Sequence, residues 1–455
     1  MNFISIWRRI DQMSPFDKIV AQLLAIFYVS VSRTELFKAL QKSEHLALLK
    51  KGALLNQQLE SSLVRLAAAG LIVEEKAVRG VSGIRMPPGI SWEAMREMVD
   101  QEGFAGLVRA VQETTPAIIQ YTWGLSRAVS YDLCLREIRV GLLSNDIEPV
   151  NYFVDLAKKE FPEANRMPPF VRLCLQPLRL EWLASRTMAL QSKALAEIME
   201  HLVKTCGPYE SLMPLLESYR LVPVERHGPF FRHIWVVFLL LANRLAEARE
   251  ILGGDEPVEA PLCLRAWSAC LQGDNERAIM GFEESLRMLG KGNKGKIKKG
   301  FLVHPSGPFF ILALLKSGNR SHRRTAMEYM DLVFRATFDP YRPAYEALFA
   351  LALVMDNRVQ AAQSWLEQEE TGGEVASDIA TIHRRLVGGG NRVVLEGMPG
   401  FFQFFHVLAH YWIDPEKARQ HIPVIKELVT LARDNGHVWM ARESAALLNG
   451  LEGNK

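Results

Sequence analysis

The residues best suited to chemistry in this chain are cations concentrated in one stretch. Between Glu284 and Glu328 there is no acidic residue, while ten Lys and Arg residues lie there. Such a stretch attracts phosphate groups, because bound cations release the counterions that a polyanion holds. Four glycines in residues 290–300 indicate a loop. The predicted phosphate-binding residues are Lys291, Lys294, Lys296, Lys298, Lys299, Arg320, Arg323 and Arg324. A solvated connector with no ligand is the alternative interpretation.

The same stretch contains a near match to the phosphate-binding loop of nucleotide hydrolases. Residues 290–296 satisfy the pattern GxxxxGK, but Ile297 stands where a Ser or Thr must hold magnesium. The residues before the loop have a helical pattern, whereas a phosphate-binding loop follows a strand. We therefore expect no nucleotide site here.

Two histidines have the spacing of metal ligands on one helical face. His406 and His410 are four residues apart, but Val407 occupies the position where zinc proteases have Glu. The many aromatic residues around them favour a packed core. No GxSxG or GxGxxG pattern and no paired carboxylates stand out. We therefore expect no catalytic residue, no metal, no cofactor and no enzymatic activity.

Composition limits the class of protein. The chain has 455 residues, of which 49% are hydrophobic and 23% charged, with a net charge of +3; these values are typical of globular proteins. Five scattered cysteines without a CxxC pair favour reduced thiols. The apolar runs at 19–31 and 234–242 are shorter than the roughly 20 residues that cross a bilayer. We expect no membrane association and a cytoplasmic location.

Residues 1–90 predict a small module of three helices and a hairpin. Ser14 before Pro15 is a suitable start for a helix through Val29. Ser32 with Glu35 has the capping-box spacing for a second helix, over residues 33–40.

The third helix should start at Asn56 as N-cap and end at Gly70, with leucines 59, 63 and 66 on one face. Strands are expected at 71–73 and 84–86, around a turn at 79–83. This order resembles the winged helix-turn-helix family, whose members include DNA-binding proteins.

The outward face of that third helix is the second candidate site. Polar side chains on it can bind base edges, and nearby cations can bind phosphates. The candidate residues are Lys50, Lys51, Gln57, Gln58, Ser61, Arg65, Arg79 and Arg85. Contact with a protein or packing of a domain is an equally open interpretation, because a fold does not determine a function.

Residues 228–455 predict a helical repeat. Residues 262–289 are predicted to form two amphipathic helices joined at 273–275, and they resemble one tetratricopeptide unit. Aligned alanines, Ala248, Ala278, Ala326 and Ala361, are 30, 48 and 35 residues apart. Residues 91–227 are predicted to be a helical linker region. The expected fold class is therefore mainly α, an irregular tetratricopeptide-like α-solenoid preceded by the winged helix.

The segment 302–315, Leu-Val-His-Pro through Leu-Ala-Leu-Leu, adds one further resemblance. Together with the winged helix and the repeats, it is similar to the N-terminal region of large bacterial Swi/Snf-type DEAD/DEAH-box helicases. The chain contains none of that family's ATPase motifs. The resemblance therefore implies an accessory region that targets or regulates the motor.

Three functions follow as hypotheses. The first is a non-catalytic module associated with DNA or RNA backbone, whose solenoid binds a protein partner or the ATPase motor. The second is a free-standing helical-repeat adaptor that binds only protein. The third is a transcription regulator that senses a small ligand.

Overall fold

A computed structural model describes most of the chain. The described residues are 10–43, 53–76, 82–120, 126–161, 163–175, 180–220, 235–240, 242, 244–252, 262–289, 305–334, 341–367 and 400–453. They are mainly helical, which confirms the predicted fold class at that level. The chain divides into two compact units, Met1–Ala194 (unit 1) and Leu195–Lys455 (unit 2). This division falls inside the region that the sequence assigned to a linker.

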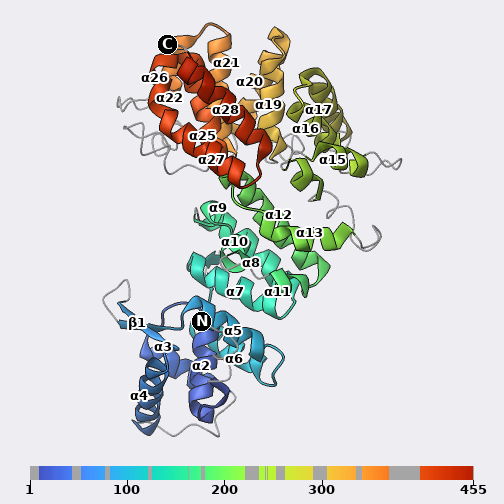
Figure 1. Cartoon of the computed structure of the whole chain (residues 1–455). Helices are drawn as coiled ribbons and strands as arrows, with labels where there is room; N and C mark the ends of the chain where they lie inside the picture. The colour runs from blue at the N-terminus through green and yellow to red at the C-terminus, as the bar shows by residue number, and fades with distance from the viewer. Residues whose placement is uncertain are drawn as a thin grey trace. The chain divides into compact units, whose positions relative to one another are not determined.

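Unit 1 combines helices with two short antiparallel hairpins (Figure 1, blue to teal). Its elements are α2 (Pro15–Phe27), α3 (Arg33–Lys42), α4 (Ala53–Ala68), β1 (Val73–Lys76), β2 (Ser82–Arg85), α5 (Pro88–Met98), α6 (Phe104–Thr114), β3 (Ile118–Gln120), β4 (Ser126–Ala128), α7 (Tyr131–Leu143), α8 (Ile147–Glu160), α9 (Glu163–Arg166), α10 (Pro169–Cys174), α11 (Leu180–Ala184) and the first part of α12 (Met188–Thr205).

The first two helices begin where their caps predict. The side chain of Ser14 accepts a hydrogen bond from the amide of Asp17, and Pro15 is the first residue of α2. Ser32 and Glu35 form the reciprocal capping box at the start of α3. Both predictions are confirmed, because these signals are local in the sequence.

The predicted start of the third helix is wrong. Helix α4 already includes Ala53, so Asn56 lies inside it and is exposed. Leu55 is buried together with Leu59 and Leu63, which extends the apolar face one turn further back. Burial of that extra turn outweighs the preference of Asn for the N-cap position.

The hairpin exists, but its first strand starts two residues later than predicted. Strand β1 pairs with β2 in the register Val73↔Arg85 to Lys76↔Ser82. A further bridge joins Val31 to Ile84, with mutual amide–carbonyl distances of 3.0 and 2.8 Å. This bridge ties the segment between α2 and α3 to the hairpin, which local pattern alone did not indicate.

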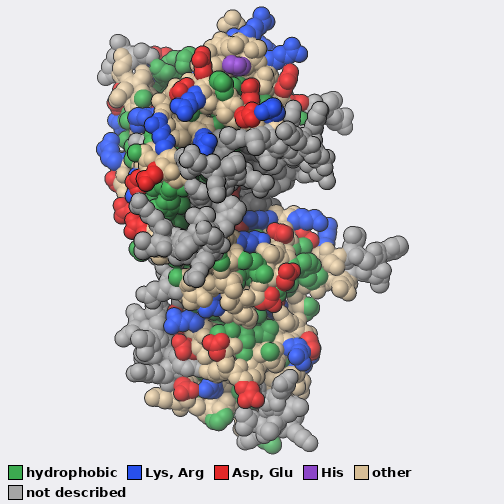
Figure 2. All heavy atoms as spheres, turned by 90° about the vertical axis from the view of Figure 1, so that its right-hand side faces the viewer, with side chains coloured by type: hydrophobic (Ala, Val, Ile, Leu, Met, Phe, Trp, Pro, Cys, Tyr) green, Lys and Arg blue, Asp and Glu red, His purple; other side chains and the backbone are tan. Residues whose placement is uncertain are grey.

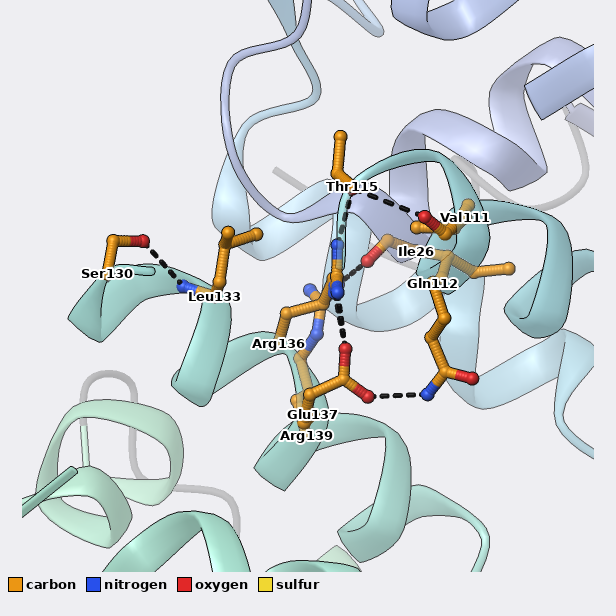
Figure 3. A network of polar contacts seen from close by, with 9 residues as sticks. All are labelled: Ile26, Val111, Gln112, Thr115, Ser130, Leu133, Arg136, Glu137 and Arg139. Atoms are coloured by element: carbon orange, nitrogen blue, oxygen red, sulfur yellow. Dashed lines mark hydrogen bonds and ion pairs between the residues drawn. The ribbon is translucent and has the colours of Figure 1, made fainter. Parts of the chain in front are cut away.

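A buried polar network connects α7 to the rest of unit 1 (Figure 3). Arg136 binds the adjacent carboxylate of Glu137 and donates to Thr115 Oγ1 at 2.7 Å. Gln112 of α6 donates to the other oxygen of Glu137. Arg136 and Glu137 are both buried, so each charge is compensated by its neighbour.

Arg139, one turn along α7, is fully buried and holds the end of α2. It donates to the carbonyl oxygens of Ala25 and Ile26 and to Ser91 Oγ, and its guanidinium lies 4.5 Å from the ring centroid of Tyr28. Burial lowers the pKa of Arg139 to about 9, so it stays charged at neutral pH. The partial negative charge at the C-terminus of α2 compensates it in place of a carboxylate.

Unit 2 consists of helices in its described part (Figure 1, green to red). After the end of α12 they are η2 (Glu210–Leu212), α13 (Met213–Arg220), a short helix at 235–240, α15 (Leu245–Leu252), α16 (Leu262–Leu271), α17 (Asn275–Leu289), α19 (Ser306–Lys316), α20 (Arg320–Phe334), α21 (Arg342–Met355), α22 (Val359–Glu367), α25 (Gly400–Ile413), α26 (Pro415–Ala418), η3 (Arg419–His421), α27 (Ile422–Asp434) and α28 (Val438–Gly453).

Four helix pairs of unit 2 are α16–α17, α19–α20, α21–α22 and α27–α28, and each is joined by a turn of three residues. The middle residue of each turn has a positive φ: Gly273 (84°), Gly318 (70°), Asn357 (58°) and Gly436 (75°). This conformation lets the amide of the following residue return to the helix, as Asp274 does to the carbonyl of Ala269. The predicted hairpin over 262–289 is confirmed by α16 and α17.

These turns give a better alignment of the hairpins than the alanines do. Gly273, Gly318 and Asn357 are 45 and 39 residues apart along the chain. In the third hairpin Ala362 is fully buried while Ala361 is only half-buried, so the predicted alignment there is wrong by one residue. Whether an alanine packs depends on which side of the helix faces the core. The spacing of alanines in the sequence did not determine that side.

The turn between α27 and α28 packs against the end of α12, at the start of unit 2. Tyr209 donates its hydroxyl to the carbonyl of Gly436, and Asn435 donates to the carbonyl of Cys206 at 2.8 Å. His437 Nε2 lies 2.8 Å from the carbonyl oxygen of Gly207. Three contacts thus join segments about 230 residues apart in sequence.

The last helix also contributes to the core of unit 2. The Trp439 ring packs edge-on against Phe309 of α19 and Phe404 of α25, with centroids 4.8 and 5.6 Å apart. Arg442 donates to the carbonyl of Leu271 at the end of α16. The C-terminal hairpin therefore closes back on earlier hairpins of the same unit.

We expect Gly436→Ala to destabilise the chain more than Gly273→Ala. Both glycines have a positive φ, which costs an alanine about 1–2 kcal/mol. A Cβ at Gly436 would also lie 2.6 Å from the Tyr209 hydroxyl oxygen, whereas a Cβ at Gly273 meets no atom within 4 Å. Urea unfolding of both variants measures the difference. Equal losses of stability would contradict the packing of this turn.

Candidate nucleic-acid interface

The outward face of α4 carries mostly uncharged side chains, with the exposed Glu60 among them. Its leucines pack inward, so Leu54, Gln57, Ser61 and Val64 point to solvent. Gln57 and Ser61 are one turn apart, and Ser61 donates to the carbonyl of Gln57 at 2.8 Å. Amide and hydroxyl groups at this spacing can bind base edges. Gln58, the third polar residue predicted here, is half-buried.

Two large apolar side chains share this face. The exposed fraction is 57% for Leu54 and 68% for Val64. The exposure of single apolar residues is common, but two on one helical face next to polar groups can also contact a protein or a thymine methyl group. The face is therefore compatible with both interpretations of the sequence.

Arg65, predicted on the same face, is bound to a carboxylate of α2. Its Nε and Nη2 donate to the two oxygens of Asp17 at 2.9 and 2.7 Å. Asp17 is buried, and burial alone would raise its pKa, but its hydrogen bonds, led by those from Arg65, together outweigh this and hold the pKa below the usual 3.8. Arg65 therefore holds α4 on α2, a role that phosphate binding would interrupt.

Arg33 joins three elements at the edge of the same face. Its Nε lies 2.8 Å from Glu60 of α4, and its Nη2 lies 2.8 Å from Glu74 of β1. All three side chains are well exposed, at 40%, 53% and 59%. Arg33 was not among the predicted site residues, because its partners lie 27 and 41 residues away in the chain.

The other predicted cations of this module divide into two groups. Arg85 lies 3.6 Å from Glu75 across the hairpin. Lys50, Lys51 and Arg79 lie outside the described residues.

The second group of predicted phosphate-binding residues lies in and after the lysine-rich segment 290–300. Lys291, Lys294, Lys296, Lys298 and Lys299, with the near match to a phosphate-binding loop, lie outside the described residues.

The three arginines of α20 differ in their contacts. Arg323 donates to the carbonyl of Met355 and lies 3.7 Å from Asp356, so it links two neighbouring hairpins. Arg324 is highly exposed and lies 3.3 Å from Glu328. Arg320 is exposed at the first position of α20.

Arg358 belongs to the same end of unit 2. It is exposed and follows Asp356, the residue that Arg323 contacts. Sequence reasoning missed it because 34 residues separate it from Arg324. The contact of Arg323 with Asp356 joins the two hairpins, and Arg358 lies two residues beyond Asp356.

Acidic side chains are interspersed with the cations on the face that Figure 2 shows, and neither sign forms a continuous field among the described residues. Exposed ion pairs of this kind contribute about 0–1 kcal/mol each, because water screens them. They can therefore exchange partners at low cost.

Cysteine and histidine chemistry has little support among the described residues. Burial raises the pKa of Cys134, Cys206 and Cys270 to about 12, far from the range of a reactive thiolate. His406 is buried, and its neighbour His410 lies 5.1 Å from His421, measured between ring centroids. In the described ranges no three potential ligands gather as a metal site would need.

Comparison with known proteins adds no information about the function of this chain. No family model, curated protein or solved structure matches this chain. Among the described helices, none has the length and apolar character needed to cross a membrane.

We expect Arg65→Leu to destabilise the chain by about 1–3 kcal/mol, because it leaves the buried carboxylate of Asp17 without its main donor. Arg96→Leu removes an exposed arginine of the same unit, 3.7 Å from its glutamates, and should cost less than about 0.5 kcal/mol. The Asp17 contribution is present above pH 3.8 and is lost as pH falls through its lowered pKa. Urea unfolding at neutral pH and near pH 3 measures both effects.

His421 should make unit 2 sensitive to acid. Burial and the neighbouring His410 lower its pKa from 6.5 to about 4. The unfolded chain therefore takes up the proton first, and stability falls between about pH 6.5 and pH 4. We expect His421→Gln to flatten this decline. Equal slopes for His421→Gln and the wild type in urea unfolding would contradict the assignment.

Proposed function

We propose that this chain is a non-catalytic module that associates with nucleic acid and with protein. The N-terminal part of unit 1 acts as a winged helix that places α4 against a duplex. The observation that carries the proposal is the exposed polar face of α4, with Gln57 and Ser61 directed away from the core.

The arrangement around α4 supports this assignment. Helices α2, α3 and α4 are followed by the β1–β2 hairpin, and Val31 adds a bridge to it. This is the order of elements in helix-turn-helix proteins with a wing, in which one helix enters the major groove. Gln57 and Ser61 would contact base edges, and Lys50, Lys51, Arg79 and Arg85 would contact phosphates.

Unit 2 supplies the protein-binding part of the proposal. Its successive helical hairpins support an irregular tetratricopeptide-like array, although the turn spacings of 45 and 39 residues exceed the 34 of that repeat. The similarity of residues 302–315 to Swi/Snf-type helicases supports a bacterial ATPase motor as the partner. The lysine-rich segment would add contacts to the nucleic-acid backbone.

A protein ligand for α4 is the second candidate. It is favoured by the exposure of Leu54 and Val64, and by the ion pairs that already engage Arg33 and Arg65. On this alternative the chain is an adaptor and α4 binds no nucleic acid.

Fluorescence anisotropy with duplex DNA over a salt series tests the proposal. If four cations of unit 1 neutralise phosphates, log K should fall with log salt with a slope of about −3.6. If the five lysines of 291–299 also bind, the slope should be about −8. A slope near zero would favour the adaptor.

Variants assign the binding to α4. Gln57→Ala with Ser61→Ala should reduce discrimination between DNA sequences, at about 1–3 kcal/mol for a lost base contact, while the salt slope stays the same. Gln101→Ala, an exposed glutamine next to α5, is the control. Unchanged sequence preference in the α4 variant would remove the base-reading role.

A further inference from the structure

The junction of α3, α4 and β1 contains an arginine whose contacts suit a second function. Arg33 is the first residue of α3 and binds Glu60 of α4 and Glu74 of β1, each at 2.8 Å. We propose that Arg33 is a phosphate-binding residue of this chain, and that Glu60 and Glu74 occupy its guanidinium until nucleic acid replaces them. This inference rests on the nucleic-acid function proposed above.

The position of Arg33 suits contact with a phosphate. Glu60 lies on α4 between Gln57 and Val64, both of which are exposed on the outward face. A guanidinium bound to Glu60 therefore stands at the edge of the surface that would meet a duplex. Phosphates border the base edges in a groove, so a cation at this edge is suitably placed for one of them.

The guanidinium of Arg33 can bind either a carboxylate or a phosphate. A guanidinium binds carboxylate and phosphate with the same planar donor geometry, so one acceptor can replace the other without rearranging the arginine. The two glutamates outnumber the single guanidinium, which leaves one excess negative charge at the junction. This charge weakens the binding of a phosphate at the junction, so removing the carboxylates should strengthen that binding.

The exposure of the bound carboxylates determines whether an arginine can leave them for a phosphate. Arg65 binds a carboxylate that is only 4% exposed, and it cannot leave without exposing or stranding a buried charge. The partners of Arg33 are 53% and 59% exposed, so water solvates them once they are released. The two arginines that join α4 to its neighbours therefore differ. Arg65 holds α4 on α2, whereas Arg33 can exchange its carboxylate partners for a phosphate.

The proposal predicts a gain of binding when the glutamates lose their charge. Glu60→Gln with Glu74→Gln should raise the affinity for duplex DNA about fivefold and make the salt slope steeper by about 0.9, the value for one additional phosphate. Adding Arg33→Gln to this variant should abolish both changes. Anisotropy over the same salt series measures them.

A matched control separates this effect from a general change of charge. Arg96 of α5 also lies between two glutamates, Glu93 and Glu97, each at 3.7 Å. Glu93→Gln with Glu97→Gln removes the same charge from the same unit and should leave the salt slope unchanged. Equal gains in the two variants would overturn the proposal.

The outcomes also distinguish this inference from the proposed function. Salt-dependent binding of the wild type that is unaffected by Glu60→Gln with Glu74→Gln contradicts only the role of Arg33. No binding by the wild type or by this variant contradicts both. Binding that appears only in the variant supports the inference and shows that the glutamates suppress the interaction. An unchanged thermal unfolding midpoint confirms that the fold is intact.

Discussion

A buried guanidinium that is held by backbone carbonyls is the constraint on which unit 1 depends. Arg139 binds the carbonyl oxygens at the end of α2 and lies over the ring of Tyr28. The end of a helix has unpaired carbonyls and a partial negative charge, so it can hold a cation that has left water. This contact fixes where α2 ends relative to α7, and α4 in turn packs on α2 through the pair of Asp17 and Arg65.

The composition of the candidate interface depends on how α4 is held on α2. Because Asp17 is buried on α2, the guanidinium of Arg65 is engaged there, and the outward face of α4 presents mostly uncharged side chains beside Glu60. Positive charge then enters from neighbouring elements, at the α3 start and in the hairpin. The partners of Arg33 and Arg85 are exposed carboxylates, which water would solvate if the arginine left them.

Unit 2 is constrained by its C-terminal hairpin. The turn at Gly436 packs on the end of α12, and Trp439 fills space between Phe309 and Phe404. A simple stack of hairpins contacts only its neighbours in sequence, whereas this hairpin returns to the beginning of the unit. The last helices of unit 2 therefore cover part of its earlier ones.

Sequence alone determined the features that depend on neighbours within a few residues. The caps at Ser14 and Ser32, the helical hairpin over 262–289 and the mainly helical class follow from spacing and local hydrogen bonding. The start of α4 was not determined in this way, because burial of Leu55 against another helix decided it. Tertiary structure alone decided which cations are engaged: Arg65 by a buried acid, Arg323 by a neighbouring hairpin, and Arg33 by two exposed glutamates. The energy of a charge depends on its partners and on its distance from water, and folding sets both by joining residues far apart in the chain.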